Sequence, residues 1–237
     1  RRAHSRQSPR FGAFGQGGAD MAAIADRYLR HFQGAAFGLP WQVDPMWEGM
    51  TLIPGRDCGA CTVCCTVMTI NKPEIQKESG VTCRHCTAGG CAIYDSRPPV
   101  CRAWYCAWRT VDIFDVAWRP DMSGVMPYVE TEGISSDFDL STGIGLMLVG
   151  NPLKTVRQRW LQDFVETGLM NSVPLFLSLP GPRGHQAVTT SLNTEEMLGY
   201  IRRGMVKEGL EAALRVLRAS RFEKAVITHA GNDVGLA

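Results

Sequence analysis

The cysteines of this chain are confined to one short segment. All nine lie between Cys58 and Cys106, and the rest of the 237-residue sequence contains none. The segment opens with the pattern C-x-x-C-x-x-C-C, which runs from Cys58 to Cys65. Two-residue gaps between cysteines allow one tight turn to direct several sulfur atoms at a single ion or cluster. The distribution therefore predicts a metal-binding or iron–sulfur protein.

The chemistry of thiolates limits what such a segment can bind. Thiolates are strong ligands for zinc, Cu(I) and iron–sulfur clusters, and poor ligands for Mg²⁺ and Ca²⁺. One tetrahedral zinc ion or one 4Fe–4S cluster uses four ligands, so nine cysteines exceed one site and are enough for two. The pattern leaves zinc and iron equally open. The candidate ligands are Cys58, Cys61, Cys64, Cys65, Cys83, Cys86, Cys91, Cys101 and Cys106.

Cys64 and Cys65 are adjacent, and this makes them inequivalent. Neighbouring side chains point about 100° apart on a helix and nearly opposite ways on a strand. We expect one of them to serve a first site. The other then faces a second site, bridges two metals, or is buried as a small apolar residue.

Arginines accompany the cysteines, while acidic residues are few. Positive charge offsets the charge of thiolates and favours the deprotonated form. A solvated basic surface is the alternative explanation. The arginines are Arg56, Arg84, Arg97, Arg102 and Arg109.

A disulfide framework is the alternative to a metal centre. The sequence has no apolar h-region of a secretory signal, which predicts a reducing, cytoplasmic location where disulfides are rare. The odd number of cysteines and the adjacent Cys64–Cys65 pair also argue against disulfides.

Charge is distributed unevenly along the sequence. The formal net charge is +2, but residues 1–20 hold four arginines against Asp20 and contribute +3, so the rest sums to −1. A body so near neutrality has no general attraction for nucleic acid or an anionic membrane, and neither is an expected partner. A protein partner stays open. Residues 1–20, rich in Gly, Ser and Arg, are expected to be a disordered N-terminal extension.

Hydrophobic periodicity predicts an α+β protein. Residues 21–57 are interpreted as a helix and an irregular lead-in, residues 58–120 as the cysteine-cluster segment, and residues 121–237 as an α+β region. In the last region we expect a small antiparallel sheet with two covering helices. The predicted strands are residues 125–129, 144–149, 173–179 and 186–190, and the predicted helices are residues 152–168 and 194–219. Gly204 and Gly209 should weaken the final helix or break it in two.

The cysteine segment itself is predicted to be irregular. Only residues 72–77 are typical of a regular element, a short helix with Pro73 in its first turn. Outside this stretch the segment has too little apolar material for a core, so its ligands should hold it together.

The motifs of the segment resemble those of a known family. The C-x-x-C-x-x-C-C run is followed by C-x-I-Y-x-x-R-P-x-x-C from Cys91 to Cys101, and then by Cys106. This combination resembles the CxxCxxCC family of zinc- or iron-chelating proteins, the YkgJ-type cysteine cluster proteins, often labelled iron–sulfur oxidoreductases. The matching stretch is residues 57–120, and residues 118–121 also look like an element found after the cysteines in one bacterial subgroup. The resemblance implies metal binding by this segment.

Other residues of the segment receive supporting roles. His85 is a candidate ligand or a hydrogen-bond donor to one. Arg97 is expected to donate to a thiolate or to backbone carbonyls, and Tyr94 to be structural. Three tryptophans are expected to shield the site from water or to pack beneath an irregular loop. They are Trp104, Trp108 and Trp118.

No catalytic motif accompanies the cysteines. The sequence has no P-loop, dinucleotide fingerprint, nucleophile elbow or HExxH motif, so enzymatic activity and catalytic residues stay unassigned. The leading interpretation is a cytoplasmic metal-binding protein that chelates zinc or an iron–sulfur cluster. An iron–sulfur oxidoreductase or electron carrier, and an interaction module with a structural zinc site, are the alternatives.

Overall fold

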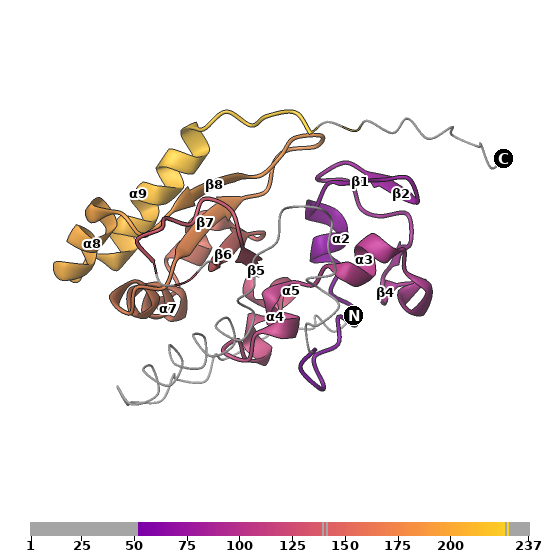
Figure 1. The fold of residues 1–237 in the computed structure, drawn as a ribbon, viewed down its shortest axis with the longest axis horizontal. Coiled ribbons are helices and arrows are strands. Elements are labelled where there is room, and N and C mark those ends of the chain that lie inside the picture. Colours follow the sequence, from indigo (N-terminus) through magenta and orange to yellow (C-terminus); the bar gives the residue numbers. More distant parts are fainter. Residues whose placement is uncertain (1–51, 139, 141, 226, 228–237) are drawn as a thin grey trace, which may run out of the picture.

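The protein consists of a cysteine-rich part beside a sheet covered by helices (Figure 1). The computed structural model describes residues 52–138, 140, 142–225 and 227. The predicted extension at residues 1–20 and the predicted helix that follows it lie outside the described residues. Within the described ranges, no helix combines the length and the apolar character that crossing a bilayer requires.

A four-stranded sheet forms the centre of the C-terminal part. Its order is β5-β6-β7-β8, with bounds Val125–Glu130, Gly143–Leu148, Leu175–Leu179 and Val188–Ser191. The α+β class is therefore confirmed. The antiparallel expectation holds for β5–β6 and β7–β8 but not for β6–β7, which are parallel. The reason is the helical connection between β6 and β7, which returns the chain to the end of the sheet where β6 began.

Four helices cover this sheet instead of the predicted two. They are α6 (Pro152–Val156), α7 (Arg159–Met170), α8 (Glu195–Arg202) and α9 (Val206–Ala219). The first predicted helix is interrupted at Gln158, which has extended backbone and caps α7. The second breaks at Gly204, whose φ of +68° suits glycine. Gly209, in contrast, stays inside α9. Its lack of a side chain allows α9 to approach α8 closely, since a Cβ there would lie 2.6 Å from the sulfur of Met197 in α8.

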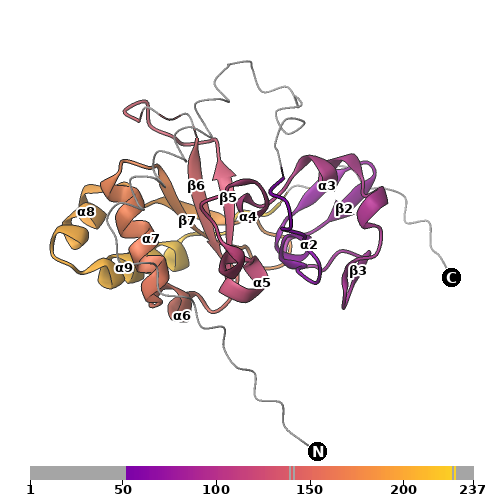
Figure 2. The same cartoon turned by 90° about the horizontal axis from the view of Figure 1, so that it is seen from below.

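The sheet lies between these helices and the cysteine segment (Figure 2). Leu175 of β7 packs against Gly168 of α7, where an added Cβ would be 2.7 Å from a Leu175 methyl. On the other face the Tyr128 ring lies over Gly145, where an added Cβ would be 2.0 Å from Cζ. Both faces of the central strands are thus closely packed.

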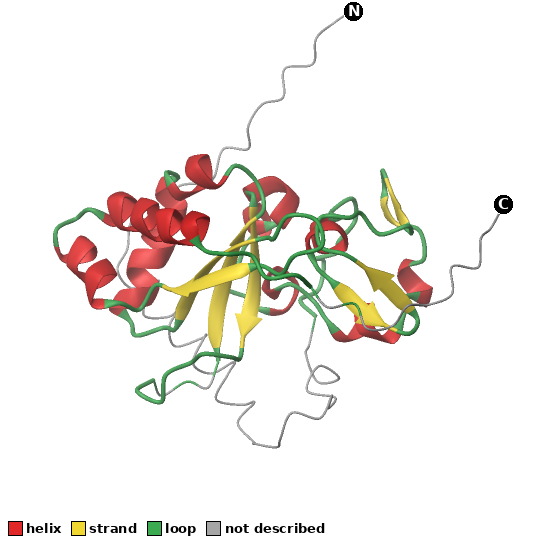
Figure 3. Ribbon diagram, turned by 90° about the horizontal axis from the view of Figure 1, so that it is seen from above, coloured by secondary structure: helices red, strands yellow, loops and turns green. Residues whose placement is uncertain are grey.

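The cysteine segment contains short elements joined by loops (Figure 3). Two antiparallel hairpins are present, β1 (Ile70–Lys72) with β2 (Ile75–Lys77), and β3 (Cys86–Thr87) with β4 (Gly90–Cys91). Two short helices, α2 (Val63–Val67) and α3 (Pro99–Ala103), flank them. The short helix predicted at residues 72–77 is wrong. Pro73 instead lies in the two-residue turn between paired Lys72 and Ile75, a position where its fixed φ favours a turn.

The connection between the two parts belongs to the main core. It comprises α4 (Ala107–Thr110), the 3₁₀ helix η2 (Val116–Trp118) and α5 (Pro120–Ser123). Trp118 is 2% exposed and its ring centroid lies 4.7 Å from those of Trp160 and Phe164 of α7. Cys106 and Trp108 are buried in the same cluster. The core therefore extends across the expected division at residue 120.

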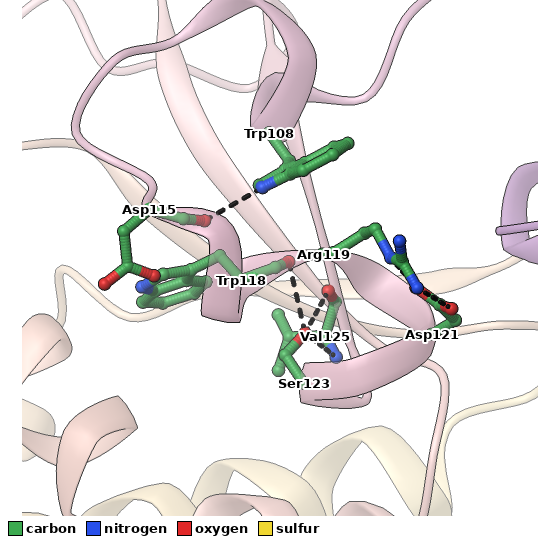
Figure 4. A network of polar contacts seen from close by, with 7 residues as sticks. All are labelled: Trp108, Asp115, Trp118, Arg119, Asp121, Ser123 and Val125. Atoms are coloured by element: carbon green, nitrogen blue, oxygen red, sulfur yellow. Dashed lines mark hydrogen bonds and ion pairs between the residues drawn. The ribbon is translucent and has the colours of Figure 1, made fainter. Parts of the chain in front are cut away.

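Polar contacts fix this connection to the first strand of the sheet (Figure 4). Trp108 Nε1 donates to the Asp115 carbonyl at 2.8 Å. The Ser123 hydroxyl donates to the carbonyls of Trp118 at 3.3 Å and Val125 at 2.9 Å. Trp108 and Trp118 thus take part in the hydrogen bonds of this junction and are also buried in the core.

Candidate metal centre

Eight of the nine cysteines line one cavity of about 220 Å³. The remaining wall is mostly apolar and aromatic, and includes Met68, Ile93 and Trp104. Of the three tryptophans expected to shield the site, Trp104 is the one that lines this cavity. All nine cysteines are free thiols. The cavity cysteines are Cys58, Cys61, Cys64, Cys65, Cys83, Cys91, Cys101 and Cys106.

Three of these cysteines lie on the side of the main core. We call Cys58, Cys61 and Cys106 the Cys58 group. The Cys61 N–H donates to the Cys58 carbonyl at 2.8 Å, which forms the first turn of the motif. Cys106 is the N-cap residue of α4, and its carbonyl accepts a hydrogen bond from the N–H of Arg109 at 2.9 Å. The backbone N–H of Asp121, in α5, bonds to the Cys61 thiol.

Four cysteines are connected to one another around the hairpins. We call Cys65, Cys83, Cys86 and Cys91 the Cys65 group. The N–H of Cys83 donates to the Cys65 carbonyl, and that of Cys86 to the Cys83 carbonyl, each at 2.9 Å. Cys86 and Cys91 are directly paired across β3 and β4. The thiols of Cys65 and Cys86 share a hydrogen bond, so Cys86 belongs to the site although it does not line the cavity.

Arg109 brings a buried positive charge to the Cys58 group. Its side chain is 4% exposed, and Nη1 lies 3.4 Å from Cys58 Sγ and 2.7 Å from the Tyr94 hydroxyl. Burial lowers the pKa of Arg109, but the hydrogen bonds with Cys58 and Tyr94 outweigh it and the net shift is upward. The guanidinium is therefore a permanent cation beside the Cys58 sulfur.

Arg97 connects the loop before α3 to the same two tyrosines, Tyr94 and Tyr105, that Arg109 contacts. It donates to the carbonyls of Tyr94 at 2.8 Å and Cys101 at 3.3 Å, as expected from the sequence, and to the Tyr105 hydroxyl at 3.2 Å. Its guanidinium also lies 3.8 Å from the centroid of the Tyr94 ring. This stacking combines a cation–π contact with fixed orientation of the loop before α3.

Lys77 is a site residue that the sequence interpretation missed. It is 6% exposed, and its ammonium donates to the carbonyls of Thr66, Glu78 and Val81 at 2.8–3.0 Å. Burial lowers the pKa of Lys77, while the thiols of Cys83, Cys65, Cys64 and Cys86 raise it, with a net shift downward. The sequence signal that could have identified Lys77 is alternation with a period of two residues, because Ile75 and Lys77 share the buried face of β2.

Burial keeps several of the thiols protonated in the metal-free protein. Desolvation, followed by the charges of Cys58 and Cys61, raises the pKa of Cys106 to about 12. Desolvation likewise raises the pKa of Cys86 to about 12, and a hydrogen bond with Cys64 raises the pKa of Cys65. A metal must therefore displace protons in order to bind these sulfurs.

The other residues singled out from the sequence differ in how close they lie to the cavity. His85 lines the cavity, and its Nε2 accepts a hydrogen bond from Arg84 at 3.2 Å. Arg56 donates to the carbonyls of Trp108 and Val111, and Arg102 is exposed. Two of the five arginines, Arg97 and Arg109, thus line the cavity.

The donor set fits a thiolate-ligated metal group. Eight thiols surround the cavity, and buried Lys77 and Arg109 supply positive charge beside them. In the described part of the chain, no three histidine, cysteine or acidic side chains are already positioned to hold one ion. Each cysteine has a single torsion between backbone and sulfur, so its sulfur can be redirected without backbone movement. The backbone thus gathers the sulfur atoms around one cavity, and rotation of these side chains would be needed to direct three of them at one ion.

Comparison with protein-family models, with curated proteins and with solved structures found no match to this chain.

Proposed function

We propose that this protein binds zinc or an iron–sulfur cluster through its cysteine segment. The observation that carries the proposal is the convergence of eight thiols on one cavity, from positions as distant in sequence as Cys58 and Cys106. Single neutral thiols are often buried as small apolar groups, but eight thiols that converge on one cavity form the donor set that soft metals prefer. The resemblance to the CxxCxxCC family supports the same conclusion.

The chain's own residues would hold such a group and offset its negative charge. The nine cysteines are its candidate ligands, and the bound metal supplies Lewis-acid or electron-transfer chemistry. Arg109 and Lys77 offset thiolate charge at opposite groups of cysteines, and Trp104 with Met68 limits access of water. The sheet and its helices act as the scaffold on which this segment is fixed.

The free thiols suit a reducing compartment, and we propose a cytoplasmic location. The partner is then the metal ion or cluster itself, with neither nucleic acid nor membrane required.

Anaerobic purification with elemental analysis, acid-labile sulfide assay and visible absorption tests the proposal. We expect stoichiometric metal in the protein as purified. Iron with sulfide and a visible band would favour an oxidoreductase or electron carrier, whereas zinc alone would favour a structural site in an interaction module. Protein that lacks metal and also fails to take up zinc or iron anaerobically would contradict the proposal.

A further inference from the structure

The thiols around the cavity are not one uniform set. The Cys58 group is attached to the main core through α4 and α5, by the contacts of Arg109 and Asp121. The Cys65 group is attached to the hairpins, by two backbone hydrogen bonds and the pairing of β3 with β4. The backbone hydrogen bonds that join one cysteine to another all run within a group.

Each group has its own buried cation. Arg109 lies 3.4 Å from Cys58 Sγ, on the core side. Lys77 is anchored by three carbonyls from the segment that carries Cys65 and Cys83, on the hairpin side. A four-thiolate zinc centre has a net charge of −2, so a separate cation beside each group is what two anionic centres require.

Resting on the proposed function, we infer that the cysteine segment holds two metal centres, one on the Cys58 group and one on the Cys65 group. The Cys65 group supplies four thiols, a complete set for one tetrahedral ion or one cluster. The Cys58 group supplies three thiols and leaves a position open toward the cavity. Cys64 and Cys101 border the Cys65 group, because the thiol of Cys64 shares a hydrogen bond with that of Cys65 and the charges of Cys65, Cys83 and Cys91 act on Cys101.

Cobalt titration tests this inference independently of the native metal. Metal-free protein is titrated anaerobically with Co²⁺, and the sulfur-to-cobalt charge-transfer absorption is followed. The parent protein should saturate at two equivalents. Cys106→Ser and Cys91→Ser should each saturate at one equivalent, and the double variant should show no thiolate-bound cobalt.

The outcomes separate this inference from the proposed function. Saturation of the parent at one equivalent, or complete loss of cobalt in either single variant with an intact circular dichroism spectrum, overturns the two-centre inference and leaves metal binding standing. No thiolate-bound cobalt in the parent overturns both.

A second pair of variants avoids removing any ligand. Lys77→Met should weaken one of the two equivalents about tenfold or more, because hydrogen bonds and charge contacts of this kind are worth at least that factor. The matched variant Arg102→Met removes an exposed arginine of the same segment and should leave both equivalents unchanged. Equal weakening of both equivalents by Lys77→Met would show a single coupled centre.

Discussion

Metal removal should unfold the cysteine segment and leave the sheet folded. In the described residues 52–105, the only buried hydrophobic side chain is Ile75. Burial of one such group contributes about 1.5–3 kcal/mol. Ordering the backbone costs about 1–2 kcal/mol for each residue. Ile75 thus offsets the ordering of about one to three residues. Under the proposed function, metal–thiolate bonds supply most of the remainder, because metal binding and folding are linked.

Hydrogen exchange with and without a chelator measures this effect. Amides of residues 59–101 should lose protection by at least about 100-fold, which corresponds to about 2.7 kcal/mol of opening free energy at about 1.36 kcal/mol per tenfold. Residues 106–111, 114 and 118 should change by less than about tenfold, because their side chains are buried. The control is β6, where every residue is buried.

Two results would refute the reasoning. Equal protection of residues 59–101 in both states would mean that packing and hydrogen bonds alone hold the segment. Loss of protection across β6 would mean that the core depends on the metal as well.

Two further predictions concern the scaffold. Trp118→Ala should lower the free energy of unfolding by about 3–5 kcal/mol in guanidinium titrations, because it empties a fully buried aromatic site. Val116→Ala, at a position 70% exposed, is its control and should change stability by less than about 0.5 kcal/mol; equal losses would contradict the packing argument. Burial raises the pKa of Tyr128, so above the ordinary phenol value of about 10 the unfolded chain loses a proton that the folded chain keeps, and stability falls as pH rises. Tyr128→Phe should therefore lose less thermal stability than the parent between pH 9 and about 11; parallel losses would show that the phenol is not protected by the fold.

Local sequence signals located the strands and helices of the C-terminal part. The four strands form close to their predicted positions because each is an apolar run bounded by turn residues. Gly204 marked the break between α8 and α9 for a local reason, its positive φ. The helix predicted at residues 72–77 failed because Pro73 suits both a first helical turn and a β-turn, and only pairing with β1 decides between them.

The sequence by itself determined that thiols are concentrated in one segment, since composition and spacing are local properties. Only the tertiary structure decided how those thiols are divided and which cations accompany them. Arg109 reaches Cys58 across 51 residues, and Lys77 is buried because three carbonyls converge on it. The parallel pairing of β6 with β7 and the inclusion of Trp118 in the core are also long-range outcomes. Such contacts depend on where chain segments meet in space, which a local pattern does not encode.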